Sequence, residues 1–229
     1  MMTRGEGGQT QQTGRDRLLE AGAGYTLFAG LGFLARFLPV GFHLMGAVGF
    51  LLPLAWGYRT GRWREMGFTR DNWRAALLWG LGAGLLASLI GLITLPARSL
   101  APRLGQQLAL GIPFGLLLAS PFQEFFFRGW LQTRLEGALG GWGGLLLSNV
   151  CFLLWHYLVP FAAMPGWSYP LYTVGGFLGT LAAGLVFGYS FQRTRSILAP
   201  WLAHGLSQIA FAAVGAVVFS DLAGWLAAG

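Results

Sequence analysis

Long apolar stretches alternate with short polar segments along most of this chain. A helix that crosses a membrane needs about 20 consecutive apolar residues. Stretches of this kind lie at roughly 22–40, 43–58, 75–96, 106–136, 142–160, 169–190 and 197–219. The first two are separated only by Gly41 and Phe42, so they form two spans, a hairpin or one broken unit. The pattern predicts an all-α fold, a polytopic transmembrane helical bundle of about seven to eight spans.

The beginning of the chain does not follow this pattern, because it is polar and rich in Gly, Gln and Thr. A segment of this composition cannot bury enough apolar surface to fold. A signal peptide is not indicated either, since no short apolar core with a small-residue cleavage site follows. We therefore predict two parts, a disordered cytosolic tail over residues 1–21 and a transmembrane helical domain over residues 22–229.

The composition narrows the class of protein. Hydrophobic residues make up 55% of the 229 residues and charged residues only 10%, whereas soluble domains contain about 25% charged residues. This difference excludes a soluble globular enzyme, a disordered regulator and a disulfide scaffold. The single cysteine, Cys151, lies in an apolar stretch, so we expect a buried thiol and no intramolecular disulfide. Many of the 37 glycines, such as Gly80 and Gly84, have the spacing of closely packed membrane helices.

The net charge of +7 comes from arginine alone, since the chain contains no lysine. The arginines are concentrated in short loops, above all in the loop 59–74 and at Arg134, Arg193 and Arg195. Loop arginines follow the positive-inside rule of membrane proteins. The distribution therefore places the N-terminus and these loops in the cytosol and argues against nucleic-acid binding. An Arg-only chain is typical of a GC-rich genome, which indicates the inner (plasma) membrane of a bacterium.

Several ionisable residues lie inside the predicted spans. They are Arg36, His43, Glu124, Arg128, His156 and His204. Each is costly in a membrane and needs a partner or a function. Arg36 and His43 flank a turn, from which their side chains can reach the interface. Taken alone, Glu124 and Arg128 can be a structural ion pair, because residues four apart share a helix face. Each histidine taken alone can be a core residue that makes a hydrogen bond.

Taken together, the interior polar residues indicate a site built from three helices. Gln208 lies four residues after His204 and shares its helix face. With a rise of about 1.5 Å per residue from the cytosolic helix ends, Glu124, His156 and His204 lie at depths of roughly 18, 21 and 10 Å. We expect them to line one cavity that opens to the cytosol. Such a set suits hydrolysis, in which a carboxylate takes a proton from water and histidine and amide groups stabilise the oxyanion.

Three segments resemble the motifs of a known family. They are Gln123-Glu124-Phe125-Phe126-Phe127-Arg128-Gly129, Phe152 to His156 and His204 to Gln208. They are similar to the pattern Glu-Glu-x-x-x-Arg, Phe-x-x-x-His and His-x-x-x-Asn of the CPBP family. This family contains the type II CaaX prenyl proteases and the bacteriocin-processing or immunity proteins, and is also called the Abi family. The resemblance covers residues 106–210, and three ordered motifs at matching spacing make it specific.

The resemblance implies an intramembrane endopeptidase, a hydrolase that acts on membrane-anchored proteins or peptides in the lipid bilayer. In the family, the first Glu activates water, the second Glu orders the site with the Arg, and the two histidines support the oxyanion together with the Asn. Carried over by position, the site residues are Gln123, Glu124, Arg128, His156, His204 and Gln208. No cofactor is expected; zinc or another divalent metal is the minority alternative.

Two of these positions depart from the family pattern. Gln208 in place of Asn keeps an amide donor and adds one methylene group. Gln123 in place of Glu removes the general base, because an amide does not accept a proton near neutral pH. Glu124 cannot take over this role, since neighbouring helical residues point about 100° apart. The protein is therefore expected to be inactive at this site, by nature or as an inactivated variant, or to work differently.

Other functions remain as alternatives. The main one is a non-catalytic membrane binder of the immunity type. A zinc protease motif of the His-Glu-x-x-His kind is absent from the sequence, and Ser207 lies too close to His204 on one helix for a serine protease pair. A small transporter is disfavoured by the absence of paired half-helix repeats. Because prenylation is mainly eukaryotic, we expect a bacterial processing role rather than maturation of prenylated proteins.

Overall fold

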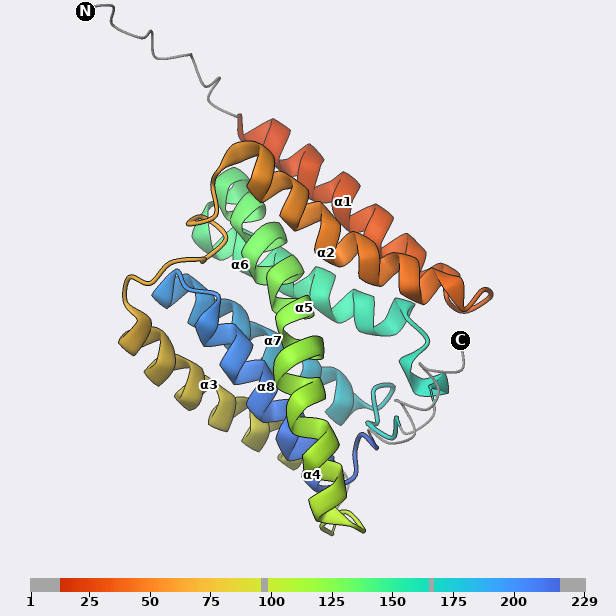
Figure 1. The fold of residues 1–229 in the computed structure, drawn as a ribbon. Helices are drawn as coiled ribbons and strands as arrows, with labels where there is room; N and C mark the ends of the chain where they lie inside the picture. The colour runs from red at the N-terminus through yellow and green to blue at the C-terminus, as the bar shows by residue number, and fades with distance from the viewer. Residues whose placement is uncertain (1–12, 96–98, 165–166, 219–229) are drawn as a thin grey trace, which may run out of the picture.

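The structure, a computed structural model, describes residues 13–95, 99–164 and 167–218, and these residues are almost entirely helical (Figure 1). The α-helices are α1 (Gly14–Leu34), α2 (Val40–Thr60), α3 (Trp73–Thr94), α4 (Leu104–Pro113), α5 (Ser120–Glu124), α6 (Thr133–Leu158), α7 (Val174–Thr194) and α8 (Leu198–Ala213). The remaining helical turns are the π-helical segments η1 (Phe114–Ala119) and η2 (Phe125–Gln132) and the 3₁₀ turn η3 (Phe161–Ala163). The described residues contain no strand, only an isolated bridge between Trp167 and Val217. The predicted all-α fold is confirmed.

Four helical stretches of the described residues are long and apolar enough to cross a membrane. They are Val40–Thr60, Trp73–Thr94, Leu104–Leu158 and Val174–Thr194. The third contains two of the predicted spans, because the chain turns back at Gly140, whose φ of 78° and ψ of 169° suit glycine alone. Large apolar side chains such as Leu78, Leu85 and Ile93 are exposed on the outside of the bundle, as expected for lipid-facing surfaces. The span count of seven to eight stays a prediction.

The boundary of the predicted tail differs from the observed one. Helix α1 begins at Gly14, so residues 14–21, which we expected to be disordered, are helical. Thr13 caps the helix in a capping box with Asp16, and the hydrogen bond from the Thr13 hydroxyl holds the pKa of Asp16 below its usual value. Capping, which the composition of the segment did not reveal, extends the helix by two turns. The rest of the predicted tail, residues 1–12, lies outside the described residues.

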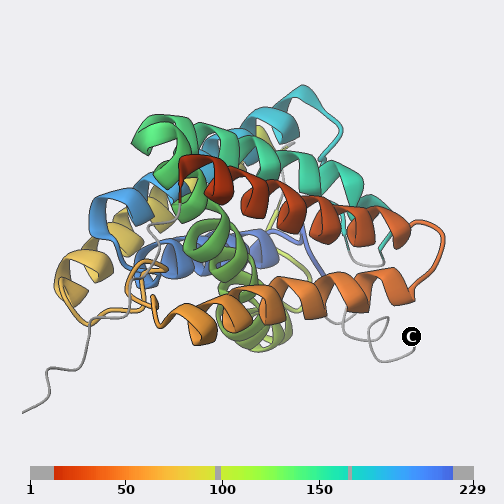
Figure 2. The same ribbon diagram turned by 90° about the horizontal axis from the view of Figure 1, so that it is seen from above.

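The helices pack in two groups around the helix that carries the first motif. Helices α1 and α2 run side by side (Figures 1 and 2), and the Tyr25 hydroxyl of α1 donates to the carbonyl of Cys151 on α6 at 2.8 Å. Helices α3, α7 and α8 form the other group, and α7 also contacts α6. The small face of α3 fits α8 closely, since a Cβ on Gly84 would lie 3.1 Å from Cα of Ala203.

Most arginines of the described residues lie at one end of the bundle, which we call the arginine-rich end. Helices α1, α3 and α8 begin there, and α2 and α7 end there (Figure 1). At this end, Nε of Arg134 on α6 lies 3.4 Å from Oε2 of Glu20 on α1. The amide of Ile197, just before α8, donates to the carbonyl of Gly67 at 3.0 Å. The arginines at this end are Arg15, Arg17, Arg59, Arg62, Arg64, Arg70, Arg74, Arg134, Arg193 and Arg195. Arg36 and Arg103 lie at the other end.

Candidate active site

Two prolines interrupt the helix that carries the first motif. Pro113 and Pro121 lack the amide proton that the interior of an α-helix requires. The π-helical segments η1 and η2 each begin within about one turn after a proline. Wider turns of this kind are frequent at functional sites. Here they flank α5, the short helix whose last two residues are Gln123 and Glu124.

The first π-turn also connects this helix to α8. The amide of Ser120 donates to the carbonyl of Gly115, five residues earlier. The carbonyl of Leu116, which an α-helix would pair with Ser120, instead accepts a hydrogen bond from the indole N–H of Trp201. The wide turn thus exchanges a bond within the helix for a bond to α8, the helix that carries the third motif.

Glu124 is completely buried and has two basic partners. Its Oε1 lies 2.7 Å from Nδ1 of His204 on α8, and its Oε2 lies 3.3 Å from Nε of Arg128 one turn later. Glu124 and Arg128 are 0% and 1% exposed. A buried charge requires a partner of opposite sign, and the two residues supply it to each other. Glu124 therefore links the first motif to the third.

Arg128 in turn connects η2 to α7. Its Nη2 donates to the carbonyl of Gly184 at 2.8 Å, and its guanidinium lies over the ring of Phe152 at 4.4 Å from the centroid. A Cβ at position 184 would lie 2.1 Å from Oδ1 of Asn149, so glycine lets α7 approach α6 without displacing that side chain. The close approach of α7 gives the buried guanidinium a second partner besides the Glu124 carboxylate.

His204 lies between Glu124 and Gln208. Its Nε2 is 3.2 Å from Nε2 of Gln208, and its ring stacks on Phe187 with centroids 4.8 Å apart. Because the carboxylate of Glu124 only accepts hydrogen bonds, the network places a proton on Nδ1 of His204. One of the two amide protons of Gln208 is used in the bond to Nε2 of His204, which leaves the other for a ligand.

His156 has a different hydrogen bond. Its Nδ1 lies 2.9 Å from the carbonyl oxygen of Phe152, one turn earlier on α6. A backbone carbonyl only accepts, so Nδ1 carries the proton and Nε2 offers a lone pair. His156 is half-buried in the last turn of α6. In the neutral form of His156, this hydrogen bond leaves the lone pair of Nε2 directed away from the backbone.

An apolar cavity of about 240 Å³ lies beside these residues. Two amides and one imidazole line it, those of Gln123, His156 and Gln208, and the other walls are mainly aromatic and aliphatic. Oε1 of Gln123 is buried and has no hydrogen-bond partner among the described residues. A smaller cavity of about 70 Å³ shares His156 and Gln208 with the first and extends to His204. A buried amide oxygen without a partner is suited to accept a hydrogen bond from water or a ligand in the cavity.

The site residues named from the sequence come close together, but they form two groups. Glu124, Arg128 and His204 make a buried chain, Gln123 and His156 face the cavity, and Gln208 belongs to both. Glu124 lines neither of these two cavities, so the expectation that Glu124, His156 and His204 line one cavity is wrong for Glu124. The reason is that the helix turns its side chain about 100° away from that of Gln123. The catalytic roles of the site residues stay predictions.

Two polar residues named from the sequence lie apart from this site. Arg36 donates from Nε to the carbonyl of Leu158 at 2.8 Å, and from Nη2 to the carbonyl of Tyr157. It thereby caps the carboxyl end of α6, where the helix dipole favours a positive charge. His43 is exposed on α2.

The described residues do not contain a complete set of groups for a metal site or for a serine nucleophile. In this part of the chain, no three side chains of His, Cys, Asp or Glu are grouped so that they could hold a metal. The hydroxyl of Ser207 donates to the backbone carbonyl of His204 at 2.7 Å. It is therefore directed to the backbone and not to a histidine ring, as a serine nucleophile would need to be.

The direction of the cavity differs from the sequence-based expectation. The sequence predicted a cavity that opens towards the helix ends rich in arginine. The structure instead builds the cavity walls from the other half of the bundle, including Phe42 near the start of α2 and Phe161 after the end of α6. The half nearer the arginine-rich end is filled by buried aromatic side chains such as Phe126 and Trp130. This aromatic packing closes the side of the arginine-rich end. The expectation was based on how deep each polar residue lies along its helix, and depth alone does not show which side of the site is filled.

Sequence reasoning missed several residues that position the site. The carbonyls of Phe152 and Gly184 orient His156 and Arg128, and the ring of Phe187 stacks on His204. Phe152 was visible as part of the second motif. Gly184 and Phe187 carry no signal in the sequence, because a backbone acceptor and an apolar ring look like ordinary helix-packing residues.

The fold and the site define an integral membrane protein with a polar site inside a helical bundle. Residues 105–210 match the family described as Rce1-like: Type II CAAX prenyl endopeptidase Rce1-like. The match covers a little less than half of the 229 residues, and over this stretch the resemblance to the CPBP family is confirmed. Searches of the curated proteins and of the solved structures found no match.

Proposed function

We propose that this protein is an intramembrane endopeptidase that hydrolyses peptide bonds of membrane-anchored proteins or peptides. One observation carries the proposal: Gln123, His156 and Gln208 line a single apolar cavity, and Gln208 contacts the histidine that is paired with Glu124. An apolar cavity excludes bulk water, which strengthens electrostatic interactions inside it. The protease family supplies the reaction class.

In this proposal His156 is the general base, in place of the glutamate that the chain lacks at position 123. Oε1 of Gln123 accepts one hydrogen of a water molecule, which leaves the other hydrogen directed to Nε2 of His156. The proton passes to Nε2 while the water oxygen forms a bond to the scissile carbonyl carbon. General-base catalysis of this kind contributes about 10²–10⁴-fold to a rate.

The remaining steps use the free amide proton of Gln208. As the carbon–oxygen bond forms, the electron pair of the carbonyl moves to its oxygen, and Gln208 donates a hydrogen bond to the resulting oxyanion. The intermediate then collapses: the carbonyl re-forms, the carbon–nitrogen bond breaks, and the leaving amine takes the proton from Nε2 of His156. Glu124 is a positioning residue, which fixes His204 and through it Gln208.

The test replaces the proposed base. His156→Gln keeps a polar side chain but removes the basic nitrogen, so cleavage of membrane-tethered peptides by the reconstituted protein should fall by about 10²-fold or more. His43→Gln is the matched control, because His43 is exposed and does not line the cavity, and it should cleave like the parent. Thermal unfolding in detergent shows whether both variants are folded. Undiminished cleavage by folded His156→Gln would contradict the assignment.

A second candidate function is non-catalytic binding of a membrane peptide. Gln123 itself favours it, because an amide at this position can hold a peptide group without accepting a proton. Under this alternative, a tethered peptide binds with unchanged affinity after His156→Ala and His204→Ala are introduced together, and neither the parent nor Gln123→Glu cleaves it. Loss of binding in the double variant would speak against it.

A further inference from the structure

The site is closed on the side of the arginine-rich end. Phe126, Phe127 and Trp130 follow the first motif in that direction and are 0%, 0% and 2% exposed. Phe28 of α1 stacks on Phe126 with centroids 4.0 Å apart, and Met66, from the connection between α2 and α3, is buried in the same cluster. A polypeptide cannot reach the site through this layer without displacing tightly packed aromatic rings.

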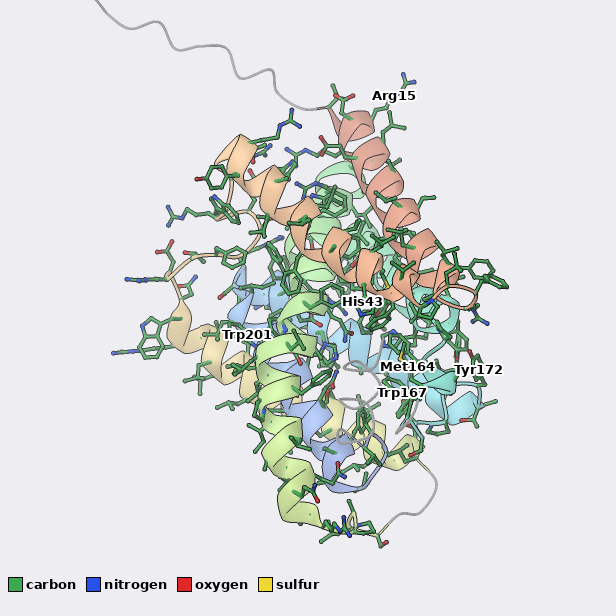
Figure 3. All side chains as sticks on the ribbon, turned by 45° about the vertical axis from the view of Figure 1, so that its right-hand side comes forward. Arg15, His43, Met164, Trp167, Tyr172 and Trp201 are labelled. Atoms are coloured by element: carbon green, nitrogen blue, oxygen red, sulfur yellow. The ribbon has the colours of Figure 1, made fainter. Side chains whose placement is uncertain are left out.

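The walls of the cavity come from the opposite half of the bundle. Phe42 and Met45 lie in the first two turns of α2, which begins at the arginine-poor end. Met164 and Trp167 lie in the connection between α6 and α7, at the same end. Figure 3 shows Met164 and Trp167 well away from Arg15, which marks the start of α1.

We propose that substrates enter the site from the membrane face opposite to the arginine-rich end. The positive-inside rule places the arginine-rich end in the cytosol, so the entrance faces the extracytoplasmic side of the bacterial inner membrane. The proposal rests on the peptidase function above and narrows its substrate class. The substrate is an exported or membrane-anchored polypeptide that presents an apolar segment from the extracytoplasmic half of the bilayer. The aromatic walls favour apolar side chains next to the cleaved bond.

The charge distribution supports this direction independently of the cavity. Arg64, in the connection between α2 and α3, has an exposed side chain that pairs with Asp71. Arg193 lies over the ring of Trp79 at the same end. At the other end of the described residues lie Arg36 and Arg103, and Arg128 is buried between the two ends. This asymmetry is the signal that sets orientation during membrane insertion.

Cysteine accessibility tests the proposal in the full chain. Cys151→Ser removes the single cysteine, and one new cysteine is then introduced at a time. Gly46→Cys reports the cavity, because Gly46 lines it and a Cβ there has no other atom within 4 Å; Met164→Cys is a second reporter should the first not fold. Arg64→Cys marks the arginine-rich end, and Tyr172→Cys marks the opposite end, where Tyr172 is exposed. The probe is a positively charged, membrane-impermeant methanethiosulfonate.

The expected result is labelling of Gly46→Cys, Met164→Cys and Tyr172→Cys in spheroplasts, and of Arg64→Cys only in inverted membrane vesicles. Labelling of the cavity cysteines only in inverted vesicles, or in neither preparation, would overturn the proposal. The readout needs no catalysis, and cleavage in detergent does not depend on sidedness. Failure of the access proposal and failure of the peptidase proposal are therefore distinguishable.

Discussion

Gln123 and Glu124 are neighbours in the chain, yet their side chains have different surroundings. Oε1 of Gln123 is buried without a partner among the described residues beside the cavity, whereas both oxygens of Glu124 face basic nitrogens of Arg128 and His204. The helix turns the two side chains about 100° apart. The carboxylate therefore pairs with basic side chains in the interior, whereas the amide of Gln123 and the ring of His156 line the cavity.

Replacement of the buried carboxylate should destabilise the protein. Glu124→Gln leaves the Arg128 guanidinium buried without its counter-charge, so we expect a loss of about 3–5 kcal/mol in the free energy of unfolding. Glu65→Gln is the matched control, because Glu65 pairs with Arg62 at a half-exposed site, where such pairs contribute about 1 kcal/mol or less. Chemical or thermal unfolding in detergent measures both. Equal stability of the two variants would show that the buried pair does not hold the helices together.

Much of this residue-scale arrangement was predictable from the sequence. The four-residue spacing of Glu124 and Arg128 predicts a shared face, and the three motifs predict that His156 and His204 meet them. The hydrogen bonds that fix the two histidines were not predictable, because the acceptor of His156 is a backbone carbonyl and the stacking partner of His204 is an ordinary phenylalanine. Backbone acceptors and apolar rings leave no pattern in a single sequence.

Helices α3 and α8 are held together by small residues. A Cβ on Gly84 would lie 2.7 Å from Cδ1 of Leu206 and 3.1 Å from Cα of Ala203, whereas a Cβ on Gly82 would meet no atom within 4 Å. Close approach of this kind is the usual basis of helix association in membranes. The close packing of α3 against α8 fixes the position of α8 along the bundle, and with it the positions of His204 and Gln208 beside the first motif.

The two glycines of α3 provide a matched test of this packing. Gly84→Leu inserts a side chain into the α3–α8 interface and should lower the free energy of unfolding by about 1–3 kcal/mol. Gly82→Leu adds the same side chain on the outer face and should leave stability unchanged or slightly higher, because glycine is the poorer helix former. Thermal unfolding in detergent compares them. A larger loss for Gly82→Leu would mean that the outer face of α3 is not lipid-facing.

At the level of elements, glycine and proline explain where the predicted and observed boundaries agree and differ. Gly140 lies between the predicted spans 106–136 and 142–160, and its non-helical backbone reverses the chain there. The π-helical segments after Pro113 and Pro121 were not predicted, since a proline signals a lost hydrogen bond but not how the helix compensates. The helical turns at residues 14–21 depend on the cap at Thr13, which composition alone does not reveal.

For the molecule as a whole, the proposed chemistry and the cavity walls come from different parts of the chain. All the proposed site residues lie within residues 105–210, which match the protease family. The cavity walls on α2, among them Phe42, Met45 and Phe50, lie before this region. The three motifs therefore predicted the family match, whereas the direction and lining of the cavity depend on long-range packing between α2, α6 and α8.

The central claim is that this cavity is a peptidase site in which His156 compensates for the amide at position 123. The most direct test compares the purified parent with Gln123→Glu on one library of membrane-tethered peptides, with mass spectrometry of the products. We predict slow cleavage by the parent and cleavage of the same bonds by Gln123→Glu that is faster by about 10²-fold, because a carboxylate is restored beside the water. Cleavage by Gln123→Glu alone would contradict the role of His156, and no cleavage by either protein would contradict the peptidase itself.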